Sequence, residues 1–245
     1  MKLTIMYDNR SYKEGWETGW GFSCVADNGK DRVLFDTGDN PYKLVGNFKK
    51  SEIDIKQIEA ITFSHQHWDH VDGLEGFLNI NKSARVYIPV SFPKKIMELV
   101  SENGNDIIHS GQKVEEISDG IYIMPVLKKI FKPAEQGLVL KINGGLALVT
   151  GCAHPGIVNM VRKTNELFNR KVKIILGGFH LSTKSDSKVK KIIKKLKEEG
   201  VSYFAPSHCT GRIAIDLFKE ECGKKYIQTG CGKSLELNSL EKENL

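Results

Sequence analysis

The sequence predicts a mixed α/β (α+β) chain that folds as a four-layer αββα sandwich, with two sheets packed face to face and helices on both outer surfaces. The first half of the 245 residues is rich in short apolar runs of strand length and contains a helical insert. The second half changes period and ends in alternating strands and helices. Each half therefore has strands followed by helices. No repeat of short period and no Pro/Ser-rich linker divides the chain, so we expect a single domain over residues 1–245.

Strands in the first half are predicted from apolar and β-branched runs, and helices from their caps and spacing. Asn28-Gly29 predicts a hairpin turn between two strands. Asn40-Pro41 predicts a helix N-cap followed by proline at the first helical position. The predicted strands are 2–7, 21–26, 31–36, 58–64, 85–88, 112–117 and 120–126, and the predicted helices are 41–49, 72–79 and 93–102.

In the second half, a long polar loop is predicted at 127–135, followed by two strands that Asn143-Gly144 joins. Apolar residues then recur on helical spacing. In 186–199, Val189, Ile193 and Leu196 mark one helix face and lysines occupy the other. The predicted strands are 137–142, 145–150, 172–177, 202–206, 225–228 and 234–237, and the predicted helices are 156–168, 186–199 and 211–222.

Composition indicates the compartment in which the protein is expected to reside. No stretch approaches the roughly 20 apolar residues that a membrane span needs, and the N-terminus becomes polar too early for a signal peptide. The five cysteines form no CxxC pair, which is typical of a reducing compartment. We therefore expect a cytoplasmic protein without a membrane partner.

The net charge is +6, and much of the lysine excess falls in exposed-helix patterns such as 188–197. No arginine-rich or aromatic-interleaved basic stripe supports nucleic-acid binding. The charge favours at most an anionic small-molecule substrate, and a solvated lysine-rich surface explains it equally well. The oligomeric state is left open, with a homo-oligomer allowed.

The strongest functional signal is the segment 64–73, Ser-His-Gln-His-Trp-Asp-His-Val-Asp-Gly. It places His65, His67, Asp69 and His70 within six residues, directly after an apolar strand. Side chains alternate along a strand, so His65 and His67 can project together as it ends. Three imidazoles and a carboxylate suit Zn, Fe or Mn. The segment predicts a metal site.

Three further histidines, His154, His180 and His208, each stand after an apolar strand and beside glycines that allow close approach. Each alone is as readily a structural or surface histidine. Their shared placement favours metal ligation for most of them. His109 lies in a polar Ile-Ile-His-Ser-Gly segment that we expect to be a surface turn.

The motif His65-x-His67-x-Asp69-His70 after a strand, with Asp36 closing an earlier strand, resembles the metallo-β-lactamase superfamily over nearly the whole chain. The segments Leu148-Val-Thr-Gly-Cys-Ala-His-Pro-Gly-Ile, Gly177-Gly-Phe-His-Leu and Ser207-His-Cys-Thr-Gly resemble one subgroup. That subgroup is named for an archaeal dihydropterin–ribofuranosylaminobenzene phosphate synthase.

The resemblance implies two divalent metal ions in one pocket, most readily Zn, with Fe or Mn as alternatives. It implies a first metal held by His65, His67 and His154. It implies a second metal held by the remaining set, which is Asp69, His70 and His208.

One departure from the family pattern is Cys152, which stands where the common pattern has a bridging aspartate. Its thiolate can bridge two metals, and a small buried cysteine is the alternative. Asp36 is interpreted as a carboxylate that orients a ligand histidine, and Asp72 is a second candidate for this role.

Two further features are candidates for contact with substrate. His180 is the spare histidine, suited to protonate a leaving group, with metal ligation as its alternative role. Thr210, Gly211 and Arg212 open a predicted helix, whose free N–H groups and arginine can receive a phosphate or carboxylate. An ordinary helix cap explains these three residues equally well.

The expected function is that of a metal-dependent hydrolase. A metal pair lowers the pKa of bound water to about 7 and supplies hydroxide that attacks an ester, phosphoester or similar substrate. Asp69 would orient this nucleophile and His180 would assist the leaving group.

Three alternatives remain open. The first is a synthase that condenses a pterin pyrophosphate with a phosphorylated aminobenzene riboside, with Trp16, Trp20 or Trp68 as stacking surfaces. The second is a non-catalytic ligand-sensing protein with a retained metal site. The third is a redox enzyme with iron, since His/Asp sites accept that metal.

Overall fold

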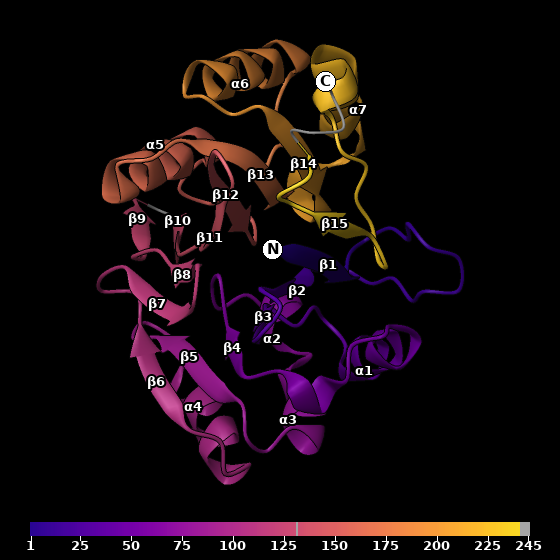
Figure 1. The fold of residues 1–245 in the computed structure, drawn as a ribbon, viewed down its shortest axis with the longest axis vertical. Coiled ribbons are helices and arrows are strands. Elements are labelled where there is room, and N and C mark those ends of the chain that lie inside the picture. Colours follow the sequence, from indigo (N-terminus) through magenta and orange to yellow (C-terminus); the bar gives the residue numbers. More distant parts are fainter. Residues whose placement is uncertain (131, 241–245) are drawn as a thin grey trace.

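The computed structural model describes residues 1–130 and 132–240, and it contains two large sheets between two layers of helices (Figure 1). The first sheet contains, in spatial order, β15 (Ser234–Glu236), β1 (Lys2–Tyr7), β2 (Ser23–Asp27), β3 (Arg32–Phe35), β4 (Ala60–Thr62), β5 (Arg85–Pro89) and β6 (Ile107–Ser110). The second contains β14 (Tyr203–Ser207), β13 (Val172–Gly178), β12 (Gly145–Thr150), β11 (Leu138–Ile142), β8 (Ile121–Ile123) and β7 (Glu115–Ser118).

Helices from each half of the chain cover the outer face of one sheet. The first sheet is covered by α1 (Pro41–Lys50), α3 (Leu74–Ile80) and α4 (Lys94–Glu102), and the second by α5 (Ile157–Phe168), α6 (Asp186–Glu198) and α7 (Arg212–Cys222). A short helix, α2 (Trp68–Val71), follows β4. Short 3-10 turns occupy Ile55–Gln57, His208–Thr210 and Gly223–Lys225.

Three apolar clusters hold these layers together. One lies between the sheets and joins residues such as Phe35 of β3 to Leu140 of β11. The other two lie between a sheet and its helices. Full burial of one such side chain stabilises the fold by roughly 1.5–3 kcal/mol. The layer order confirms the predicted αββα sandwich.

The strand directions determine where the functional residues gather. The strands β3, β4, β5 and β6 are parallel, and so are β12, β13 and β14. Parallel strands end at the same edge of a sheet. Asp36 and the histidine segment therefore follow strands that end together, and His154, His180 and His208 follow the three parallel strands of the other sheet.

Local signals account for most element boundaries. The Asn40 side chain accepts hydrogen bonds from the backbone N–H groups of Tyr42 and Lys43 at 3.0 and 3.1 Å, which confirms the predicted N-cap. Both predicted Asn-Gly hairpins form, since β2 pairs with β3 and β11 with β12 in antiparallel register.

Three element predictions are wrong. Within the predicted loop 127–135, β9 (Leu127–Lys129) and β10 (Lys132–Glu135) pair as antiparallel strands, and Leu127 packs against an apolar cluster; residue 131 lies outside the described residues. His109 lies in edge strand β6 rather than in a turn, although its side chain is exposed as expected. The predicted strand 225–228 is reduced to a single bridge between Tyr226 and Phe204.

Within the described ranges, no helix is both long enough and apolar enough to cross a membrane.

Candidate metal centre

A first group of imidazoles converges between the two sheets. His65 and His67 follow β4, and His154 follows β12. His65 Nε2 lies 3.0 Å from His67 Nδ1 and 3.3 Å from His154 Nε2. His65 and His154 are buried, while His67 is partly exposed. The structure thus brings together the three residues predicted for the first metal.

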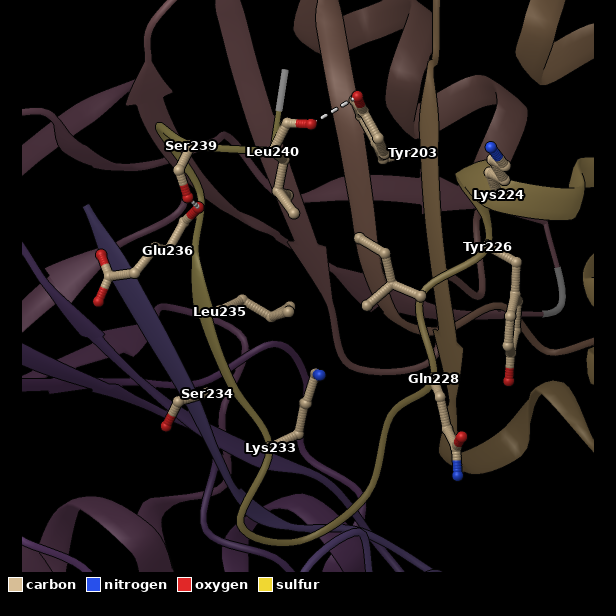
Figure 2. A pocket seen from close by; sticks show the side chains of 11 residues that line it. Tyr203, Lys224, Tyr226, Gln228, Lys233, Ser234, Leu235, Glu236, Ser239 and Leu240 are labelled. Atoms are coloured by element: carbon tan, nitrogen blue, oxygen red, sulfur yellow. Dashed lines mark hydrogen bonds between the residues drawn. The ribbon is translucent and has the colours of Figure 1, made fainter. Parts of the chain in front are cut away.

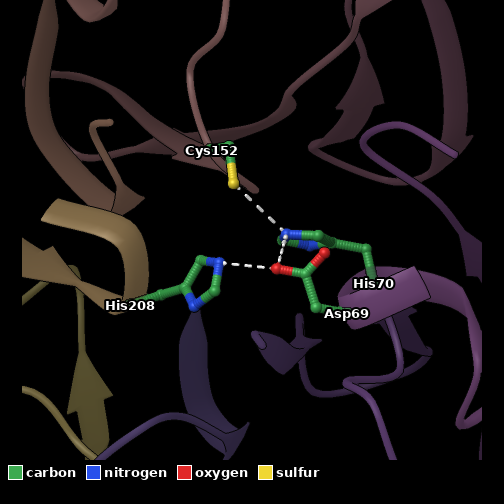
Figure 3. Close-up of side chains that lie close together, drawn as sticks. All are labelled: Asp69, His70, Cys152 and His208. Atoms are coloured by element: carbon green, nitrogen blue, oxygen red, sulfur yellow. Dashed lines mark hydrogen bonds and ion pairs between the residues drawn. The ribbon is translucent and has the colours of Figure 1, made fainter. Parts of the chain in front are cut away.

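A second group lies beside the first and contains Asp69, His70, Cys152 and His208 (Figure 3). Asp69 Oδ2 is 3.2 Å from His208 Nε2 and 3.6 Å from His70 Nε2. Cys152 Sγ is 3.3 Å from His70 Nε2. All four side chains are buried, and their ligand atoms lie within 4.8 Å of one another. This group contains the three residues predicted for the second metal.

Cys152 belongs to both groups. Its sulfur also lies within 4.8 Å of the ligand nitrogens of His65 and His154. Nitrogen donors of the first group and nitrogen and oxygen donors of the second thus surround one thiol. This placement suits a bridging ligand.

The donor atoms are better suited to bind a divalent cation than to form hydrogen bonds with one another. A neutral imidazole offers one N–H and one lone pair, yet His65 Nε2 faces nitrogens of two other histidines. His208 Nε2 is within ion-pair distance of Asp69 but makes no aligned hydrogen bond. A cation between these atoms would satisfy their lone pairs, and N, O and S donors together suit zinc.

The electrostatics of the first group keep its imidazoles neutral. Burial and the neighbouring imidazoles lower the pKa of His65 well below its usual value. Burial and the rings of His180 and His67 lower the pKa of His154 to about 3. Both rings therefore have free lone pairs at neutral pH.

Asp36 orients ligands of both groups. Its Oδ2 lies 2.7 Å from His70 Nδ1 and accepts a hydrogen bond of 2.7 Å from Ser64 Oγ. Ser64 Oγ in turn lies 2.9 Å from His65 Nδ1. Burial lowers the pKa of His70, but the carboxylates of Asp36, Asp69 and Glu135 together outweigh burial and raise it to about 9. Asp36 therefore turns His70 Nε2 towards Asp69 and Cys152, as expected from its interpretation as an orienting carboxylate.

Glu135 supports the loop that carries Cys152 and His154, a role that the sequence did not reveal. Its Oε1 accepts hydrogen bonds from the N–H groups of Cys152 and Ala153 at 2.9 and 2.8 Å, and its Oε2 accepts one from His154 at 2.7 Å. Burial raises its pKa to about 7 against the lowering effect of these donors. Because it ends a polar hairpin, no local pattern marks it.

Asp8 and Asn9 hold His208 in place and were also missed. Asn9 Oδ1 lies 2.8 Å from His208 Nδ1. Asp8 accepts hydrogen bonds from Ser207 Oγ and from the N–H of His208. Like Asp36, they directly follow a buried strand, and that placement was the one signal that could have revealed them.

His180 lies at the margin of the first group. Its ring centre is 4.6 Å from that of His154, and it is partly exposed. Its ligand nitrogen also lies within 4.8 Å of the sulfurs of Cys152 and Cys209. Its backbone φ is +53°, a left-handed conformation that costs an L-residue roughly 1–2 kcal/mol.

Several predicted residues make other contacts. Thr210 is buried, and its hydroxyl accepts a hydrogen bond from the N–H of Phe179. Gly211 lies against Ser182, and Arg212 is exposed at the start of α7. Asp72 is exposed and lines a hollow against α4. Thr210 and Gly211 thus pack against the segment that follows β13, and only Arg212 of the three is exposed.

One hollow lies away from the histidines. It measures about 950 Å³ and is lined by Tyr203 of β14 and by the segment that leads to β15 and beyond, including Lys233 and Leu235 (Figure 2). None of the predicted site residues lines it. A smaller hollow of about 420 Å³ does reach His154 and His180.

Comparisons with known proteins agree with this geometry. The family model for the metallo-beta-lactamase superfamily matches residues 21–161. The chain is 30% identical over 276 residues to the 7,8-dihydropterin-6-methyl-4-(beta-D-ribofuranosyl)-aminobenzene-5'-phosphate synthase of Methanocaldococcus jannaschii, covering 94% of each chain. It is 28% identical to the crystal structure of Tm1679, described as a metal-dependent hydrolase of the beta-lactamase superfamily, with a TM-score of 0.81 and coverage of 97% of this chain and 99% of that chain.

Proposed function

Because the chain belongs to the metallo-β-lactamase superfamily, we propose that it is a metal-dependent hydrolase of small molecules that contain an ester, phosphoester or similar bond. The observation that carries the proposal is the convergence of two ligand groups on Cys152. Two groups that share one ligand suit a pair of metal ions, and zinc is the metal that best matches imidazole, carboxylate and thiolate donors.

In this proposal, different side chains of the site have different roles. His65, His67 and His154 would hold one metal, Asp69, His70 and His208 would hold the other, and Cys152 lies where its thiolate could serve both. A divalent metal supplies a nucleophile at neutral pH by lowering the pKa of bound water to about 7. Asp69, whose carboxylate lies 3.2 Å from His208 Nε2, would accept a hydrogen bond from the nucleophile and orient it.

His180 donates a proton to the leaving group in the proposed reaction. The substrate bond to the leaving group breaks as the water oxygen adds, and the proton from the imidazole neutralises the departing oxygen. Its partial exposure beside His154 supports this role, since a substrate can reach the ring.

The proposal is tested by His65→Ala on protein purified without added metal. We expect at least one metal equivalent per chain in the wild type by mass spectrometry, and loss of metal and of turnover on phosphodiester, lactone and thioester substrates in the variant. His109→Ala is the matched control, because His109 is exposed on edge strand β6. Full activity of metal-free His65→Ala would refute the proposal.

A second candidate is a synthase that forms a bond to a pterin with release of pyrophosphate. Similarity to the archaeal synthase over most of the chain favours it. So does Trp20, which is 52% exposed and packs edge-on against His208 at 5.5 Å. It offers a stacking surface next to the ligands, whereas Trp16 is buried. Release of pyrophosphate on mixing the two substrates would distinguish this reaction from hydrolysis.

The proposal also assigns the protein to the cytoplasm. All five cysteines are free and buried, and a bridging Cys152 has to stay reduced. Reducing compartments keep thiols in that state.

A further inference from the structure

A hollow of about 420 Å³ extends from the first ligand group towards the outer helices of the second sheet. His154 and His180 line it on one side, and residues of α5 and α6 line it on the other. A molecule whose reactive bond lies at the ligand groups would therefore place its remaining atoms in this hollow.

The charged residues that line the hollow are all cationic. They are Lys132, Arg162, Lys184, Lys188 and Lys195, and no aspartate or glutamate is among the lining residues. Arg162 is neutralised by Glu199 at 2.8 Å. The four lysines have no ion pair among the described residues, and their side chains are exposed. A field of one sign in a concave site concentrates ligands of the opposite charge.

The wall between the lysines is apolar. Val158 and Ile192 are partly exposed on it, and Phe179 lies buried beneath. Ligand sites typically combine such an apolar lining with a few polar groups that fix orientation. The hollow therefore suits a molecule with an apolar or aromatic body that carries an anionic group.

A second hollow, which reaches Gln66 and Trp68 of the histidine motif, has the reverse charge. It measures about 700 Å³ and is lined by Asp39, Asp72, Glu75, Glu98 and Glu102, with Lys95 as its one cation. The two hollows therefore differ in the sign of the charge on their walls. An anionic ligand is drawn to one hollow and repelled from the other.

We propose that the hollow between α5 and α6 binds a phosphate-type group of the substrate at a distance from the bond that is cleaved. The substrate class is a small molecule with an apolar or aromatic body and a phosphate group that the reaction leaves intact. Lysine ammonium groups suit this task as point charges for phosphate. This inference depends on the proposed hydrolase function only in assuming that a bond of the substrate is cleaved at the ligand groups.

The test compares two double variants of the same helix on the metal-loaded protein. K188Q/K195Q removes two lysines that line the hollow. K190Q/K194Q removes two that bind Glu221 and Glu198 instead, at 2.9 and 4.0 Å. Both pairs reduce the net charge by the same amount, and glutamine has nearly the helix propensity of lysine.

The probe is benzylphosphonate, whose carbon–phosphorus bond resists hydrolysis, titrated by calorimetry. We expect K188Q/K195Q to weaken its binding about tenfold and K190Q/K194Q to change it less than twofold. On a substrate that carries a remote phosphate, K188Q/K195Q should raise KM by a similar factor with little change in kcat.

Equal binding to all three proteins, or no binding to the wild type at millimolar concentration, would overturn the inference while leaving the hydrolase proposal intact. Selective loss of benzylphosphonate binding in K188Q/K195Q, together with an absence of hydrolysis by the metal-loaded wild type, would support the binding site and refute the hydrolase.

Discussion

At the scale of single residues, side chains outside the two candidate ligand groups hold the ligands in position. Asp36 faces His70 and, through Ser64, His65. Glu135 binds three consecutive N–H groups of the loop with Cys152 and His154. Such outer contacts fix the tautomer and direction of ligand imidazoles. The ligands are therefore oriented before any cation arrives.

Asp36→Asn is expected to weaken metal binding at the second group by roughly 10- to 100-fold, because the amide cannot supply the charge that holds His70 Nδ1–H. Equilibrium dialysis followed by metal analysis measures this loss. Asp72→Asn is the matched control, since Asp72 is exposed and lines the hollow against α4. Equal metal retention in Asp36→Asn and the wild type would contradict the orienting role of Asp36.

Metal binding is expected to release a proton from His70. In the metal-free protein the carboxylates of Asp36, Asp69 and Glu135 together raise the pKa of His70 to about 9, so its imidazole is protonated at pH 7.5. A ligand nitrogen has to be free of its proton. Affinity for the second metal should therefore rise with pH up to about 9.

Calorimetry in two buffers of different ionisation enthalpy counts the protons released on metal binding. The Asp36→Asn variant should release fewer than the wild type, because its His70 is already neutral. Identical proton counts in the two proteins would show that His70 does not start protonated.

At the scale of elements, the sequence predicted the features that neighbouring residues in the chain determine, such as turns and helix starts. Histidine spacing located the side chains that converge after β4, and Asn-Gly and Asn-Pro signals located turns and the start of α1. It failed where pairing is set by distant residues. β9 and β10 lack an apolar pattern, and Asn9 meets His208 across 199 positions of sequence. No window of the chain contains such a contact.

Loss of the α1 cap offers a test at this scale. Asn40→Ala should lower the free energy of unfolding by about 1 kcal/mol, because the Asn40 side chain accepts two N–H groups of the first turn. Ser185 stands at the same position of α6 but makes no side-chain cap bond, so Ser185→Ala should change stability much less. Urea unfolding measures both, and equal losses would contradict the assignment of the Asn40 contact.

At the scale of the whole molecule, the two ligand groups draw donors from both sheets. His65 and His154 face one another across 89 positions of sequence, and Asp69 and His208 belong to opposite halves of the chain. A cation bound between them would act as a cross-link between segments that lie far apart in the sequence. Closing a loop costs entropy that grows only slowly with its length. If the proposed metal binds, one ion would therefore tie the two halves of the chain together, and separating them would require breaking metal–ligand bonds.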